Sequence, residues 1–178
     1  MSASPFFYIE CFNHKTNEWE KVDVYTKIKG EYEPVDVWWW NGTHELFSIL
    51  GAEESHDVPE FNGIHRGLPV SASAEMYKIF ESHCWGEEDW SYVPDVKWFN
   101  VADAKLYLHT HPTIVDLDAK EDWCLEHQCE WNEAPELTRP SPLEDLLDRV
   151  MSMVEMWDWM WDINRSYSDL RVIYWISW

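Results

Sequence analysis

Residues 37–69 read VWWWNGTHELFSILGAEESHDVPEFNGIHRGLP, and the pattern of apolar residues changes twice within this stretch. The tryptophan run ends an apolar segment, and large apolar residues then recur at helical spacing. Thr43 suits the N-cap of that helix, and Gly51 stands where a helix commonly ends. We therefore predict a strand end at Trp38–Trp40 followed by a short helix over Thr43–Leu50.

The second half of this stretch, residues 52–69, is punctuated by glycine and proline and predicts a loop. The loop carries Arg66, one of five arginines in the chain, next to Gly67. Because glycine lets a ligand or another part of the backbone come close, an arginine beside it can bind a phosphate or a carboxylate. We expect the loop to return Arg66 towards the tryptophans and the helix, which would form a pocket.

The ligand that suits such a pocket is a small nucleotide-derived molecule, whose base stacks on an indole ring and whose anionic group pairs with the arginine. The candidate ligand-binding residues are Trp39, Trp40, His44, Arg66 and His83. Competing interpretations stay open, because tryptophans often only fill a core. Arg66 could also form an ion pair with one of 34 carboxylates.

The N-terminal segment predicts an antiparallel hairpin. Residues 6–12 and 19–28 are rich in aromatic and β-branched residues, and the turn-forming sequence NHKTNE separates them. Downstream, Ser71 or Ser73 can cap a second helix that ends at Gly86, and Asn100 can cap a third over residues 101–108. Residues 87–100 show no clear period.

The C-terminal part contains the sharpest local signal. Ser141, Pro142 and Glu144 fit a capping box with proline at the first helical position, and an apolar stripe follows to about Trp161. Residues 170–178 then predict a buried, near-central strand. This order predicts an α+β fold with a mixed or mainly antiparallel sheet, short helices and one long amphipathic helix near the C-terminus.

The chain length of 178 residues predicts a single domain over 1–178, with an acidic inserted excursion at about 109–140 where periodicity fades. Zinc is the one cofactor considered, as a structural ion in this excursion. Its candidate ligands are His109, His111, Cys124, His127 and Cys129, although their spacing matches no standard finger. Otherwise we expect no cofactor.

The amino-acid composition limits the classes of partner that the protein is expected to bind. The formal net charge is −21, and the chain contains 14 tryptophans. Such acidity disfavours direct binding to nucleic acid or an anionic membrane, and it favours a basic protein surface or mimicry of nucleic acid. The N-terminus lacks a signal-peptide pattern, and no apolar run has the length of a membrane span, so we expect a cytoplasmic protein. The sequence is also compatible with a homo-oligomer.

Catalytic motifs are missing from the sequence: there is no glycine-rich phosphate loop, no nucleophile elbow and no HExxH helix. We therefore assign no catalytic residue and expect a binding protein rather than an enzyme. A metal-dependent hydrolase of a nucleotide signal, using the histidines, is a further alternative.

Several motifs resemble a family of small accessory proteins encoded in tailed-phage and prophage genomes. The matching segments are residues 40–50 (WNGTHELFSIL), 66–69 (RGLP) and 169–175 (DLRVIYW), together with the serine-led helix and His83. The excursion at 109–140 has no counterpart in that pattern. The resemblance implies a phage-encoded accessory protein with an α+β arrangement, and it supplies no activity.

Proteins of that kind often counter host defences. We therefore rank three hypotheses for the function of this protein. The first is sequestration of a small nucleotide-derived signal in the aromatic pocket. The second is an acidic inhibitor or nucleic-acid mimic that blocks a basic surface of a host defence protein through residues 116–162. The third is the metal-dependent hydrolase. The setting in each case is the cytoplasm of an infected bacterial host.

Overall fold

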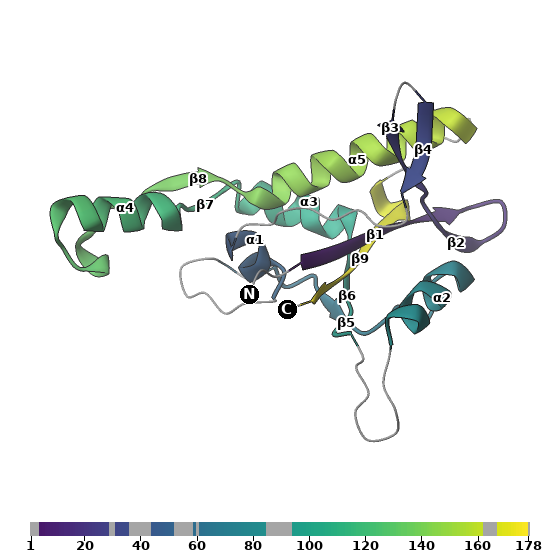
Figure 1. The fold of residues 1–178 in the computed structure, drawn as a ribbon, viewed down its shortest axis with the longest axis horizontal. Coiled ribbons are helices and arrows are strands. Elements are labelled where there is room, and N and C mark those ends of the chain that lie inside the picture. Colours follow the sequence, from purple (N-terminus) through teal and green to yellow (C-terminus); the bar gives the residue numbers. More distant parts are fainter. Residues whose placement is uncertain are drawn as a thin grey trace, which may run out of the picture.

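The computed structural model describes residues 4–28, 31–35, 44–51, 59, 61–84, 94–161 and 167–177. It has an α+β fold in which every strand pairing of the described residues is antiparallel (Figure 1). The predicted strand at Trp38–Trp40 and the predicted N-cap at Thr43 lie outside the described residues. None of the helices in the described ranges is both long enough and apolar enough to cross a membrane.

A five-stranded sheet forms the centre of the fold, in the order β2-β1-β9-β6-β5. Its strands are β1 (Ser4–Asn13), β2 (Glu18–Lys21), β5 (His65–Arg66), β6 (Lys97–Asn100) and β9 (Leu170–Ser177). Residues 170–175 are all buried because β9 lies between β1 and β6 and both of its faces are covered. The predicted near-central strand is thereby confirmed.

The predicted N-terminal hairpin is confirmed for β1 and β2, whose turn places Asn17 in the left-handed region at φ 60°. The second predicted strand, however, does not run on to residue 28. It stops at Lys21, and the next residue, the buried Val22, still donates its N–H to Ile9 O at 2.8 Å. Residues beyond it form β3 (Val24–Ile28), which pairs with β4 (Glu31–Val35) as a separate ladder.

The two faces of the sheet are covered by different helices. On β1, Phe7 and Ile9 point to one face and Tyr8 and Glu10 to the other, as strand alternation requires. Figure 1 shows α3 and α5 on one side of the sheet and α2 on the other. The larger core, on the first face, includes Phe7, Ile9, Leu46, Leu50, Phe99, Val101, Ala104, Leu146, Val150, Val172 and Tyr174.

Helix α1 (His44–Ile49) occupies the predicted position, and Gly51 ends it in the left-handed conformation at φ 63°. Side chains of the sheet bind its last carbonyl oxygens. Tyr174 Oη donates to Leu50 O at 2.7 Å, and Lys97 Nζ donates to Gly51 O at 2.9 Å. These bonds satisfy carbonyls that a helix end leaves unpaired, so they fix α1 on the larger core.

Helix α2 (Ala74–His83) covers the other face through Met76, which is fully buried. Its N-cap is Ser73, one of the two predicted serines, whose Oγ accepts from Met76 N–H at 3.2 Å. The helix ends at His83, three residues before the predicted Gly86, which lies outside the described residues. Helix α3 (Val101–Thr110) begins at the predicted residue and runs two residues beyond the predicted end.

Helix α5 (Pro142–Trp161) begins where the capping pattern predicts. The predicted side-chain bond is not formed: Glu144 N–H donates to Ser141 O at 3.0 Å, while the buried Ser141 Oγ has no partner in the described part of the chain. Leu143, Leu146, Leu147, Val150 and Val154 are buried along one side of the helix. Side chains after residue 155 in this helix lie outside the description, including Trp157, Trp159 and Trp161.

Residues 112–140, here called the acidic arm, leave the sheet region and return to it (Figure 1). Two short antiparallel strands, β7 (Thr113–Val115) and β8 (Thr138–Pro140), carry the chain outward and back. Between them lie α4 (Leu117–His127) and a 3₁₀ turn, η1 (Trp131–Glu133). The sequence shows no period here because α4 has no buried residue, and hence no apolar stripe.

Candidate functional site

The predicted ligand pocket is only partly described. Trp39 and Trp40 lie outside the described residues, and of His44 the structure gives the backbone position at the start of α1 but not the side chain. Arg66 is exposed on β5, and no ion pair to it is found among the described residues. His83 is partly buried at the C-terminal end of α2.

Arg66 and His83 lie on opposite faces of the sheet. Arg66 pairs in register with Lys97, which pairs with Tyr174, and directly opposed residues share a face. Arg66 therefore belongs to the face of the larger core. The His83 ring instead packs edge-on against Trp175 on the α2 face, with ring centroids 5.0 Å apart. The structure does not bring these two predicted ligand residues together.

His83 has contacts that explain its place without a ligand. Its Nδ1 lies 2.9 Å from Ile79 O, so the ring donates back to the preceding turn of α2. The ring also meets Phe6 edge-on at 5.5 Å. These contacts indicate a histidine that closes the smaller core.

A groove of about 370 Å³ opens elsewhere, between the β1–β2 hairpin and the start of α2. From the hairpin it is lined by Phe12, Asn17, Glu18 and Trp19, and from the other side by residues 71–74. Its indole ring and the exposed first turn of α2 could hold a flat, anionic molecule. Trp19 was not among the candidates predicted from sequence because it lies inside a predicted strand.

A buried ion pair lies beside this groove. Arg171 donates from Nε at 2.8 Å and from Nη2 at 2.5 Å to the same Glu10 oxygen, and the Arg171 guanidinium lies 3.9 Å from the Trp19 ring centroid. Burial lowers the pKa of Arg171 below its usual range, and the charge of Glu10 opposes that shift.

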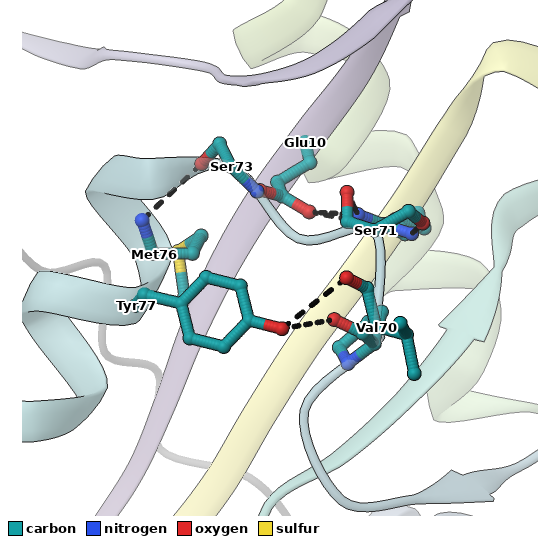
Figure 2. A network of polar contacts seen from close by, with 8 residues as sticks. Glu10, Val70, Ser71, Ser73, Met76 and Tyr77 are labelled. Atoms are coloured by element: carbon teal, nitrogen blue, oxygen red, sulfur yellow. Dashed lines mark hydrogen bonds and ion pairs between the residues drawn. The ribbon is translucent and has the colours of Figure 1, made fainter.

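Figure 2 shows how Glu10 reaches the start of α2. The second oxygen of Glu10 accepts from Ser73 N–H at 2.7 Å, and Arg171 Nη1 donates to Ser71 Oγ at 3.0 Å. Tyr77 Oη donates towards the carbonyl oxygens of Pro69 and Val70, which steadies the same turn. The network thus fixes the start of α2 against the sheet, and we interpret it as the support of the groove.

The acidic arm presents a different kind of surface. It contains eight acidic residues and two basic ones, Lys120 and Arg139, which gives a net charge of −6 over residues 112–140. Two large apolar side chains are exposed among the carboxylates: Leu125 at 70% and Trp131 at 38%. Lys120 Nζ lies 4.3 Å from the Trp131 ring centroid.

The structure does not gather the predicted zinc ligands. His111 stacks on Tyr107 and His127 stacks on Trp123, at centroid distances of 4.5 and 4.0 Å. His109 is exposed, Cys124 Sγ donates to Glu130 O at 3.7 Å, and Cys129 N–H donates to Cys124 O. No three of their donor atoms cluster, and all five residues are described.

A cluster of carboxylates is found instead at the base of the arm. Ligand-type oxygens of Glu45, Asp116 and Asp118 lie within 4.8 Å of one another. Arg139 Nη2 lies 2.5 Å from Glu45 Oε2, so the cluster also contains one positive charge. This group could not be predicted from sequence because its members come from α1 and from the start of α4, and Glu45 and Asp116 are 71 positions apart.

Comparisons with known proteins add no relative. No family model matches the chain, and no match was found among curated proteins or solved structures. The resemblance to phage accessory proteins therefore stays a prediction.

Proposed function

We propose that this chain is a binding protein whose acidic arm docks onto a basic surface of a partner protein and blocks it. One observation carries the proposal: α4 is a helix of 11 residues with no buried residue, so much of its surface is open to a partner, although Leu117 packs on the larger core and Cys124 contacts Glu130. A helix without a buried apolar stripe gains little stability from packing on its own core. Its packing surface is therefore available to another molecule.

Charge complementarity identifies the chemistry of the partner. A net charge of −6 on the arm, within a chain of net charge −21, attracts a basic surface and repels an acidic one. Such a field also steers encounter, so association should be fast at low salt. A basic nucleic-acid-binding surface on a host protein is the best fit to this pattern.

Exposed apolar side chains on the arm supply the contact that charge alone does not. Interfaces commonly centre on a few large residues surrounded by polar ones, and tryptophan is frequent among them. Trp131 and Leu125 lie among carboxylates in this way. We assign them the central contact and the carboxylates the surrounding ring.

The biological setting follows from the resemblance rather than from the geometry. Tailed-phage accessory proteins of this size often counter host defences, so we propose a host defence protein as the partner. The cytoplasm of an infected bacterial cell is then the place of action. The proposed role is inhibition by occupation of a surface, without catalysis.

Site-specific photocrosslinking tests this proposal. A photoreactive amino acid is placed at Trp131 or Leu125 of the intact chain, and, as a matched control, at Val70, which is 98% exposed and lies outside the arm. The proposal expects one protein captured from infected or host cells at both arm positions and not at Val70. Equal capture at all three positions, or no capture at the arm, contradicts it.

The groove beside Trp19 favours a second candidate function, the sequestration of a small nucleotide-derived ligand. Its volume of about 370 Å³ lies within the range of small-molecule sites. The test is to incubate the intact chain with a panel of nucleotide signals, wash it, and release the bound material by heat. Intact ligand recovered from the parent chain and lost in Trp19→Ala supports this candidate. A shortened product would instead indicate a hydrolase, and no ligand removes both.

A further inference from the structure

Three carboxylates from different parts of the chain meet at the base of the acidic arm. Glu45 lies in the first turn of α1, Asp116 is the N-cap of α4, and Asp118 lies in the first turn of α4. Their oxygens lie within 4.8 Å of one another. We propose that these three residues bind one hard divalent cation, of the Ca²⁺ or Mg²⁺ class, which fastens the arm to α1.

Glu45 gives the independent observation that points to a cation. Its side chain is 2% exposed, and its Oε2 forms an ion pair with Arg139, whose Nε and Nη2 have no hydrogen-bond partner in the described part of the chain. Its other oxygen, Oε1, is buried and has no hydrogen-bond partner in the described part of the chain. Buried carboxylate oxygens are almost always paired, because an unpaired one has lost its hydrogen bonds to water without gaining any from the protein. A cation that Glu45 binds through Oε1 would supply that partner.

The charge of the cluster fits a divalent ion. Three carboxylates and the guanidinium of Arg139 give −3 + 1, a local charge of −2. Like charges at this separation repel one another, and the repulsion is stronger where one of them is out of water. A single divalent cation neutralises the group, whereas Arg139 alone leaves it negative.

The donor atoms define the class of cation. All three are carboxylate oxygens, the ligands that Ca²⁺ and Mg²⁺ prefer, and the cluster has no nitrogen or sulfur donor of the kind that zinc favours. Asp116 Oδ1 accepts from Ala119 N–H at 3.0 Å, which orients the carboxylate. Asp118 is exposed, so water can complete the coordination sphere.

The position of the cluster gives the ion a structural role. Asp116 and Asp118 begin α4 on the outgoing side of the arm, while Arg139 belongs to β8 on the returning side. Glu45 belongs to α1, which is fixed on the larger core by Tyr174 and Lys97. An ion bound here therefore links the arm to the rest of the fold, and this holds whatever the arm binds.

Calorimetric titration of the intact chain, after removal of bound metal with a chelator, tests the proposal. CaCl2 and MgCl2 are added separately at neutral pH, and the melting temperature is recorded with each. We expect saturable binding of one ion per chain and a melting temperature that rises with ion concentration. Asp118→Asn, which removes one exposed carboxylate and keeps its shape, should weaken binding about tenfold or more, since carboxylate number sets such affinities.

The matched control is Asp122→Asn, an exposed carboxylate on the same helix and outside the cluster, which should keep the affinity of the parent chain. Glu45→Gln is a less suitable test because it leaves Arg139 unpaired and can disturb folding. Three results overturn the proposal: no saturable binding of either ion, unchanged affinity in Asp118→Asn, or equal weakening in both variants. The last would mean diffuse attraction to an acidic surface.

Discussion

Arg171 and Glu10 form a buried ion pair with two hydrogen bonds between the neighbouring strands β9 and β1. The two side chains are 2% and 0% exposed, and both Arg171 donors reach Glu10 Oε2. The other Glu10 oxygen holds the backbone N–H of Ser73 at the N-cap of α2. One carboxylate thus connects two strands and a helix, so its removal should destabilise the fold by more than the loss of a single contact.

Replacing Glu10 by alanine should destabilise the fold strongly. Arg171 would be left charged and buried, and breaking such a pair from one side costs about 3–5 kcal/mol. Urea denaturation measures the change in the free energy of unfolding. The control is Glu81→Ala, an exposed carboxylate on α2, which should stay within about 0.5 kcal/mol of the parent chain. A similar small loss for Glu10→Ala would mean that the pair contributes little.

Ser73→Ala should reduce stability by about 1 kcal/mol, since the serine hydroxyl is the N-cap of α2. Ser82 provides the comparison: its Oγ donates to Ile79 O on the exposed side of the same helix, and water can replace that bond. The quantity to compare is the midpoint of urea unfolding for the two serine-to-alanine variants. Equal midpoints would show that the cap does not hold the helix.

Tyr174→Phe should destabilise the chain by about 1–3 kcal/mol because it leaves the Leu50 carbonyl buried without a donor. Tyr77→Phe removes the same hydroxyl from a ring that is 39% exposed, so water can reach the freed carbonyl oxygens and the loss should be smaller. Thermal unfolding of the two variants side by side gives the comparison. A larger loss for Tyr77→Phe would contradict the assigned role of Tyr174 at the end of α1.

Stability should fall at alkaline pH. Burial alone would lower the pKa of Lys21, but the hydrogen bond and charge of Asp23, followed by Glu75, outweigh burial and raise that pKa. Since the pKa is higher in the folded state, the stabilisation is complete below the unfolded value of about 10.5 and is lost as pH rises through the folded value. Burial raises the pKa of Tyr107, which acts in the same direction because its phenolate forms more readily when unfolded.

The measurement is the free energy of unfolding between about pH 9 and about pH 11, the range in which lysine and tyrosine titrate. Lys21→Met should show a shallower decline than the parent chain. Lys15→Met, at an exposed position, should show the parent slope. If Lys21→Met declines as steeply as the other two chains, Lys21 does not carry the effect.

The elements that sequence predicted best are those whose signals are local. Ser73 caps α2, Gly51 ends α1, and residues 170–175 form a buried strand, because caps, left-handed glycines and continuous apolar runs act within a few residues. The separate β3–β4 ladder was missed because its boundary depends on where the chain stops pairing with β1, and no local signal in residues 19–28 marks that point. Helix α4 was missed because it has no buried side to give a period.

The candidate sites depended more on tertiary structure. The hypothesis of an aromatic pocket placed Arg66 together with His83, but the structure sets them on opposite faces of the sheet. The Glu10–Arg171 pair did leave a signal: each is the lone charged residue in an otherwise apolar strand segment, and a buried charge requires a partner. The carboxylate cluster left none, since Glu45 and Asp116 meet only through the fold.

The most direct test of the central claim is the salt dependence of binding between the intact chain and the partner captured by the arm. One variant neutralises four exposed arm carboxylates (Glu121→Gln, Asp122→Asn, Glu126→Gln, Glu136→Gln), and the control neutralises four on α5 (Glu144→Gln, Asp145→Asn, Asp148→Asn, Glu155→Gln). We predict that affinity for the parent chain and the α5 variant falls steeply as salt rises, and that the arm variant binds weakly at every salt concentration. An affinity that is independent of salt, or equal in the two variants, would contradict docking by the acidic arm.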